Sequence, residues 1–509
     1  MSTPGKPARS GDNLAATVRT GLAFTGGADA VRQVVELGTS IVLARLLLPA
    51  DFGIVAVVGS FLQISYTVGN LGMGSAVIQA ESLSKRDCDV AYTFSTMIGV
   101  MLMVCGIALA PLAAGFFRMP SLEQIMPLMS VQLLISSMSA IPVGLLRREL
   151  RFGSHAMIET SSALIYGAVG VGLAVQGYGV WSLAWAPLAS SGYLLVMSTI
   201  ATGFVPRPSL ARESRDKLLG FGSGVTFKNI FVYIGRNADN LIVARMLGGT
   251  ATGLYTRAFN FTRLPQFRLV GIIYRVCFPA FCKLRSDRRR FHDWYLKATT
   301  VVAVSVTPIL LGLCVLAEDF TIAVLGPHWA EMAMTLRLLS ISGLVTCLYT
   351  LAGAAIEATG RIRYEVATQA LYALVIVAGC IAFAGRGIEA VAIVVLSASL
   401  CLYLLKGLTL QAATGLSIAR FLGATLPSVT AGLAMCAAGV VYLDVVPDMV
   451  GLGEHHWFRL LTGTAVCSIA YIAALGLVGR SQLALVMSQG AQVITGMRRP
   501  RVQSEPSTV

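Results

Sequence analysis

Charged residues are scarce in this chain. Of its 509 residues, 13% are charged and 55% are hydrophobic, whereas soluble globular domains carry about 25% charged residues. The mean hydropathy is +0.73. Because so few charged side chains cannot cover the surface of a soluble protein of this length, the composition predicts a membrane protein.

The common motifs of enzymes and metal sites are also missing. The sequence contains no GxxxxGK[ST] phosphate loop, no HExxH zinc motif and no GxSxG nucleophile motif. Its ten cysteines form no CxxC pair and lie mostly in apolar runs, which indicates small core side chains. The acidic fragment Asp87-Cys88-Asp89 falls in a short predicted loop and is interpreted as structural. We predict a protein that is not an enzyme and that holds no metal or cofactor.

A cleavable signal peptide is lacking as well. The first twenty residues carry Lys6, Arg9 and Arg19 but no short apolar block before a small-residue cleavage site. We therefore expect the N-terminus to stay in the cytoplasm. Residues 497–509 have Pro, Ser and Arg without an apolar pattern, which is typical of a disordered tail.

What the chain does have is long apolar segments. A run of about 20 apolar residues can cross a bilayer as a helix, and Gly, Pro and charge clusters separate such runs here. The sequence predicts an all-α polytopic membrane protein of about 14 transmembrane helices, with both termini on one side. The predicted spans are 20–47, 52–80, 89–116, 122–146, 153–175, 180–204, 218–247, 253–282, 291–316, 332–358, 365–383, 389–412, 421–442 and 458–479.

The charges between the spans test this assignment. Positive residues stay on the cytoplasmic side during insertion, and the predicted inside segments hold most of the Lys and Arg. The predicted outside loops carry only Arg118 and Arg386. Topology and contact with anionic lipid heads thus explain the net charge of +14, which argues against a nucleic-acid partner.

An internal repeat relates the first and seventh spans at an offset of 200 residues. In this alignment Ala44, Arg45, Leu47 and Gly53 meet Ala244, Arg245, Leu247 and Gly253. Two weaker similarities occur on the same predicted sides, as two parallel six-helix lobes require; chance similarity among apolar segments is the alternative. The predicted division is a cytoplasmic segment 1–19, an N-lobe 20–204, an inter-lobe loop 205–217, a C-lobe 218–412, two added helices 413–479 and a cytoplasmic tail 480–509.

Polar residues inside the spans are the candidate functional residues. In the first span, offsets of three, four and seven residues put one group on a single helix face, which must point into protein or a wet cavity. An intrahelical ion pair is the simpler interpretation. This group is Asp29, Arg32, Gln33 and Glu36.

The seventh and eighth spans hold a further polar set, which includes Arg236, Asp239, Arg257, Arg263, Arg268 and Arg275. From spacings of eleven and seven residues we expect Arg257, Arg268 and Arg275 to stack on one face. A cationic lining favours an anionic passenger, because guanidinium offers a planar donor fork to phosphate oxygens. Simpler interpretations stay open: Asp239 pairs with Arg236, Arg275 anchors the topology, and Glu159 and Glu357 are hydrogen-bonded structural acids instead of proton carriers.

Several sequence motifs of this chain resemble those of a known family. They are LARLLLPADFGIVAV (43–57), NLGMGSAVIQ (70–79), RRELRF (147–152), GYGVWSLA (177–184), NADNLIVARMLGGTATGLYTRA (237–258), FPAF (278–281) and GPHW (326–329). The chain is similar to the Wzx-type polysaccharide exporters of the multidrug/oligosaccharidyl-lipid/polysaccharide exporter superfamily. The resemblance implies a bacterial inner-membrane flippase of two six-helix lobes plus two helices. It also implies a polyprenyl-diphosphate-linked oligosaccharide as substrate, a role in exopolysaccharide, O-antigen or capsule biosynthesis, polymerase machinery as a partner, and coupling to a proton or sodium gradient.

The hypothesis assigns roles to eight residues. Diphosphate contact is assigned to Arg32, Arg236, Arg257 and Arg268, and coupling or gating to Asp29, Glu36, Asp239 and Glu357. The alternatives are a drug antiporter of the same superfamily, which a cationic lining disfavours, and a membrane glycosyltransferase or polymerase. The latter would need a folded extramembrane segment, and the predicted outside loops are short. A structural scaffold would leave the intramembrane charges unexplained.

Overall fold

A computed structural model of the chain describes residues 11–69, 84–209, 223–449, 455–486 and 488. Throughout these ranges the regular structure is helical. The chain divides into two compact units, Met1–Leu254 and Tyr255–Val509. One long helix, α9 (Ser223–Pro265), runs across this division. The domain limits expected from the sequence stay a prediction.

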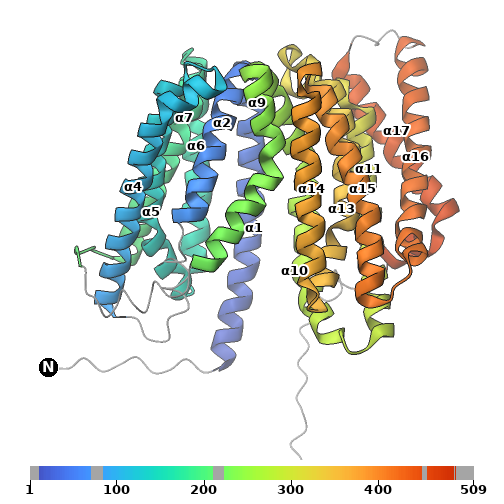
Figure 1. Ribbon diagram of the computed structural model, residues 1–509, viewed down its shortest axis with the longest axis horizontal. Helices are drawn as coiled ribbons and strands as arrows, with labels where there is room; N and C mark the ends of the chain where they lie inside the picture. Colours follow the sequence, from blue (N-terminus) through green and yellow to red (C-terminus); the bar gives the residue numbers. More distant parts are fainter. Residues whose placement is uncertain (1–10, 70–83, 210–222, 450–454, 487, 489–509) are drawn as a thin grey trace, which may run out of the picture. The chain divides into compact units, whose positions relative to one another are not determined.

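The first unit is a set of long helices (Figure 1), of which α1 and α2, and then α4, α5, α6 and α7 in turn, are joined by short connections. Helix α4 packs along α5, α5 along α7, α6 along α7, and α1 along α6. Tight turns end two of these helices, with Arg118 (φ 56°) after α4 and Gly203 (φ 63°) after α7 in the left-handed region. Besides the first part of α9, the helices are α1 (Gly11–Leu46), α2 (Pro49–Gly69), α4 (Lys85–Phe117), α5 (Leu122–Arg148), α6 (Phe152–Val175) and α7 (Val180–Thr202).

The two segments of the sequence repeat contact each other within this unit. An ideal Cβ on Gly53 would lie 1.9 Å from the carbonyl oxygen of Gly249, and one on Gly253 would lie 1.8 Å from that of Pro49. Because Pro49 and Gly249 are themselves equivalent in the repeat, the contact is reciprocal, as in a two-fold arrangement. Only residues without a Cβ permit this approach of α2 to α9.

Helix α9 is interrupted at Gly248, whose φ of 83° and ψ of −173° are not helical. The break falls between the predicted seventh and eighth spans. The eighth span is itself composite, because α9 is followed by a π-helical turn, η1 (Gln266–Val270), and then by α10 (Gly271–Leu284). A π turn holds one more residue than an α turn and shifts the register of everything after it.

The second unit is built around α13 (Ala333–Ala358), most of which is buried. Helices α10, α11 and α15 pack on α13, and α16 packs on α11 and α17 (Figure 1). Small residues from Ala352 to Ala355 let neighbouring helices approach α13 closely. The other helices are α11 (Arg288–Val315), α12 (Ala317–Phe320), η2 (Thr321–Leu325), η3 (Pro327–Met332), α14 (Ile362–Phe383), η4 (Ala384–Arg386), α15 (Ile388–Thr414), α16 (Ile418–Met449) and α17 (His456–Val478).

Eleven of the described helices are long and apolar enough to cross a membrane. The helices of the first, seventh and eighth predicted spans are not among them. These are the segments that carry the clustered intramembrane charges, which lower their hydropathy. The all-α, multi-pass fold is confirmed at this coarser level, and the number of fourteen stays a prediction.

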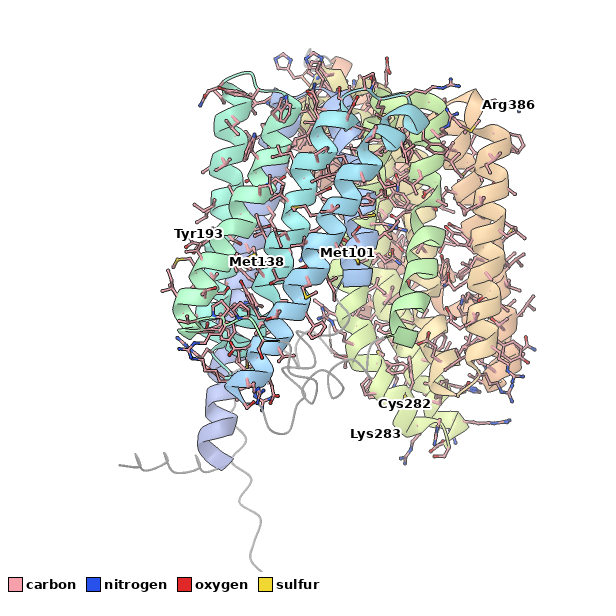
Figure 2. All side chains as sticks on the ribbon, turned by 60° about the vertical axis from the view of Figure 1, so that its left-hand side comes forward. Met101, Met138, Tyr193, Cys282, Lys283 and Arg386 are labelled. Atoms are coloured by element: carbon pink, nitrogen blue, oxygen red, sulfur yellow. The ribbon has the colours of Figure 1, made fainter. Side chains whose placement is uncertain are left out.

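The outer faces of the helices are apolar, as contact with lipid requires. Met101 of α4 is 58% exposed, and Leu112 further along the same helix is 68% exposed. Charged residues instead gather at helix ends. In the second unit, Lys283 lies at one end and Arg386 at the opposite end (Figure 2).

Candidate functional site

The polar face of α1 folds as an ion-pair ladder. Arg32 lies 3.3 Å from the carboxylate of Asp29 and 3.1 Å from that of Glu36. These partners are one turn before and one turn after Arg32, so helical spacing alone brings them together. Since one cation meets two anions, this face of α1 carries net negative charge.

A second charged group in the first unit lies on α5 and α6. Glu159 is 3.8 Å from Arg147 and 3.7 Å from His155, and the Arg147 Nε donates a hydrogen bond of 2.7 Å to His155. Glu159 is also close enough to Arg32 to act on it electrostatically. Glu159, which has no cation one turn away in the sequence, therefore lies beside an arginine from a neighbouring helix and a histidine from its own helix.

The remaining candidates of α9 lie on both sides of Gly248. Asp239 is 3% exposed and thus buried inside the first unit. The side chain of Arg236 lies outside the described residues. In the second unit, the Arg257 guanidinium lies 5.9 Å from the ring centre of Trp329, within the range of a cation–π contact.

The expectation that Arg257, Arg268 and Arg275 stack on one face is wrong for Arg257, because the helix is not a regular α-helix between Arg257 and Arg268. The π-helical turn η1 lies between Arg257 and Arg268 and contains Arg268. Its extra residue rotates the rest of the helix by roughly a quarter of a turn relative to a straight α-helix. Arg257 is accordingly half-buried, whereas Arg268 and Arg275 are exposed. Hydropathy gives no signal for such a turn.

Glu357 lies in a polar cluster of the second unit. The hydroxyl of Tyr274, from α10, donates a hydrogen bond of 3.3 Å to Glu357 on α13. Lys406 of α15 is 1% exposed and forms an ion pair with Glu365 of α14. Glu357 also acts electrostatically on Lys406. Three acidic or basic side chains from three helices thus share one buried region.

The surroundings of Glu365 hold its carboxylate in place. Gln369 donates a hydrogen bond of 3.1 Å to it from one turn further along α14. On the opposite side, an ideal Cβ on Gly353 of α13 would lie 3.1 Å from a Glu365 oxygen. Sequence reasoning missed Lys406 and Glu365, although a lone lysine inside an apolar span of 27 residues is a signal for a buried partner.

A cavity in the same unit is almost wholly apolar. It has a volume of about 550 Å³ and lies among α9, α11, α16 and α17. Its walls include Phe261, Leu264, Leu313 and Leu460, with Thr464 and Ser468 as polar members. Such a cavity suits hydrocarbon better than sugar or phosphate.

Comparison with known proteins gives a consistent result. Residues 42–334 match the family model described as "Polysaccharide biosynthesis protein". The lipopolysaccharide biosynthesis protein WzxC of Escherichia coli (strain K12) is 28% identical over 345 residues, which cover 65% of this chain and 69% of WzxC. The succinoglycan biosynthesis transport protein ExoT of Rhizobium meliloti (strain 1021) is 26% identical over 306 residues, covering 60% of this chain and 62% of ExoT.

Two solved structures share the fold. The lipid II flippase MurJ, in an inward closed conformation, superposes with a TM-score of 0.69 at 14% identity and covers 90% of this chain and 99% of MurJ. An inward-facing multidrug resistance MATE transporter gives a TM-score of 0.57 at 16% identity, with 76% of this chain and 96% of the transporter covered. The family model covers more than half of the chain. The chain therefore belongs to the polysaccharide biosynthesis protein family, whose members are multi-pass membrane transporters and not enzymes.

Proposed function

We propose that this protein is a flippase that moves a polyprenyl-diphosphate-linked oligosaccharide from the cytoplasmic to the outer leaflet of a bacterial inner membrane. The product would serve exopolysaccharide, O-antigen or capsule biosynthesis. The observation that carries the proposal is the family match over residues 42–334. The relatives named for lipopolysaccharide and succinoglycan biosynthesis support the same class of passenger.

Physical chemistry explains why such a passenger needs a protein. A diphosphate and a hydroxyl-rich glycan would lose their hydration in hydrocarbon, at a cost of several kcal/mol for each unpaired polar group. A cavity lined by arginine replaces part of that hydration with charge-assisted hydrogen bonds. Two six-helix lobes that rock about a central site would expose this cavity to each side in turn, with two further helices beside them.

The assigned residues keep their roles in this proposal. Arg32, Arg236, Arg257 and Arg268 contact the diphosphate, and Asp29, Glu36, Asp239 and Glu357 serve coupling or gating by protons or sodium ions. The link from Glu357 to Tyr274 and the nearby Lys406 supports a coupling role, because a proton on Glu357 would change the charge balance of a buried cluster. The apolar cavity beside α16 and α17 offers a surface for the isoprenoid chain.

The central experiment is the substitution Arg268→Ala. Arg268 is exposed on the π-helical turn, so we expect the variant to insert and fold normally. We expect loss of polymer export in cells and of leaflet-resolved transport of lipid-linked glycan in vesicles. Arg268→Lys should recover little, because an ammonium group cannot form the bidentate contact.

Arg386→Ala is the matched control, since Arg386 is an exposed arginine of the same unit that lies in η4, between α14 and α15. Normal export by Arg268→Ala would remove this residue from the mechanism. A glycan that is chemically changed by the purified protein would instead favour a glycosyltransferase or polymerase. A gene-dependent change in drug susceptibility, without an effect on polymer, would favour an antiporter.

A further inference from the structure

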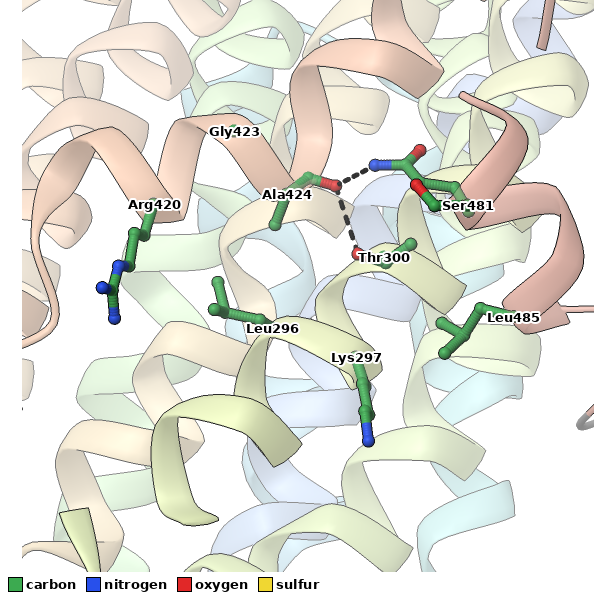
Figure 3. A pocket seen from close by; sticks show the side chains of 9 residues that line it. Leu296, Lys297, Thr300, Arg420, Gly423, Ala424, Ser481 and Leu485 are labelled. Atoms are coloured by element: carbon green, nitrogen blue, oxygen red, sulfur yellow. Dashed lines mark hydrogen bonds between the residues drawn. The ribbon is translucent and has the colours of Figure 1, made fainter. Parts of the chain in front are cut away.

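A second cavity of the second unit has cationic walls. It has a volume of about 390 Å³ and is bounded by α11, α16 and the helical segment 480–486 after α17 (Figure 3). Lys297 of α11 and Arg420 of α16 stand on its wall and are both exposed. Neither forms an ion pair with a carboxylate in the part of the chain that the structure describes, in contrast to Arg32, Arg337 and Lys406.

Hydrogen bonds fix the three walls to one another. The side chain of Gln482, which is 8% exposed, donates a bond of 3.0 Å to the carbonyl oxygen of Ala424. It also accepts a bond of 2.8 Å from the hydroxyl of Ser428. The Thr300 hydroxyl donates to the same Ala424 oxygen at 3.4 Å, so this carbonyl joins all three elements (Figure 3). These hydrogen bonds hold the walls of the cavity together, and the exposed side chains of Lys297 and Arg420 supply its positive charge.

The rest of the lining is mixed in polarity. Ser481 adds a hydroxyl group, while Leu296 and Leu485 add apolar surface. Gly423 has no side chain and leaves the cavity open. Cations and a hydroxyl beside leucines suit an amphiphile that has a phosphate joined to hydrocarbon. The volume is sufficient for a headgroup and its glycerol but not for whole acyl chains.

The position of the cavity fits the cytoplasmic edge of a bilayer. Lys297 lies nine residues into α11, about 14 Å from the start of that helix. Arg420 lies in the first turn of α16. The same end of these helices carries Arg288, Arg289 and Arg290, and the positive-inside rule places such clusters at the cytoplasmic face. The leaflet there contains the anionic lipids that attract Lys and Arg.

Two further charged groups lie beside the cavity. Asp293 is exposed one turn before Lys297 on α11, and Arg480 is exposed next to Ser481. Arg480 offsets the charge of Asp293, so Lys297 and Arg420 leave the region with net positive charge. We propose that this cavity binds the phosphate headgroup of an anionic phospholipid of the cytoplasmic leaflet. This site is separate from the transport path proposed above.

The test measures lipid binding to the full-length protein. Purified protein in neutral detergent is titrated with dioleoyl-phosphatidylglycerol or dioleoyl-phosphatidylcholine, and bound lipid is counted by native mass spectrometry. We expect the wild type to prefer phosphatidylglycerol. The double substitution Lys297→Ala with Arg420→Ala should weaken its binding about thirtyfold. The double substitution Lys297→Arg with Arg420→Lys keeps both positive charges and should leave phosphatidylglycerol binding unchanged.

The control removes two other positive charges from the second unit. Lys283 and Arg285 are exposed at the end of α10 and do not line the cavity. Their double alanine variant should bind phosphatidylglycerol as the wild type does. Equal losses in the two double variants would mean that net charge, and not this site, attracts the lipid, and would overturn the proposal.

A third arm separates the phospholipid from the transported substrate. Undecaprenyl diphosphate is added as a competitor, and it should not displace phosphatidylglycerol from the cavity. Displacement that depends on Lys297 and Arg420 would overturn the proposal and assign the cavity to the transport path. If the double variant is unstable, the single substitutions Lys297→Gln and Arg420→Gln can be tested instead. Each should weaken phosphatidylglycerol binding about fivefold. Unchanged binding in both would overturn the proposal.

Discussion

At the scale of single residues, the most unusual feature is Lys406, a lysine that is almost completely buried although it lies in the apolar helix α15. Lys406 is 1% exposed and Glu365 is 13% exposed. Removing charges from water is costly, and their attraction offsets this cost only when both partners are present. The pair is therefore weak evidence for overall stability, and we infer that it instead serves to set the register of α14 against α15.

Loss of one partner should destabilise the second unit. We expect Lys406→Met to lower the free energy of unfolding by about 3–5 kcal/mol, because Glu365 would remain as a buried, unpaired charge. Lys406→Met combined with Glu365→Leu should recover most of this loss. Thermal unfolding in detergent measures both effects. If the single variant were as stable as the wild type, the pair would be open to water in the membrane.

At the scale of elements, the contact of α2 with α9 depends on two equivalent glycines. The absent Cβ atoms of Gly53 and Gly253 leave space for the carbonyl oxygens of Gly249 and Pro49. A methyl group at either position would lie within 2 Å of backbone atoms, and backbone cannot give way as a side chain can. The two helices would have to separate along their contact.

We therefore expect Gly53→Ala and Gly253→Ala each to lower thermal stability or to reduce transport strongly. Gly59→Ala is the matched control on the same helix α2, because a Cβ there meets no atom within 4 Å. It should be neutral or slightly stabilising, since alanine favours a helix by up to about 1 kcal/mol over glycine. Wild-type stability and transport in Gly253→Ala would show that α2 and α9 do not need the close backbone contact at this glycine.

At the scale of the whole molecule, membrane sidedness can be measured directly. Cys282, next to Lys283, and Arg386 lie at opposite ends of the second unit (Figure 2). In a protein whose other cysteines are replaced by alanine, Cys282 should react with a membrane-impermeant maleimide only after the cells are permeabilised. With Cys282 also replaced, Arg386→Cys should react in intact cells. Labelling of both from the same side would contradict the topology expected from the positive charges.

Some of these features could be predicted from the sequence because they are local. The ion pairs of Arg32 with Asp29 and Glu36 result from residues one turn apart, and most helices result from long apolar runs. The partners of Glu357 and Lys406 could not be predicted, because they come from other helices and depend on tertiary packing. The π-helical turn η1 also has no hydropathy signal, and it altered the face on which Arg268 lies.

The reciprocal glycine contact has a consequence for how this protein evolved. If the two segments arose by duplication of one ancestral stretch, each copy became the other's packing partner. A mutation that enlarges one glycine is then resisted by backbone from the other copy, so neither position could diverge independently even while the surrounding sequence drifted. This constraint accounts for the survival of a recognisable repeat at this point of the chain.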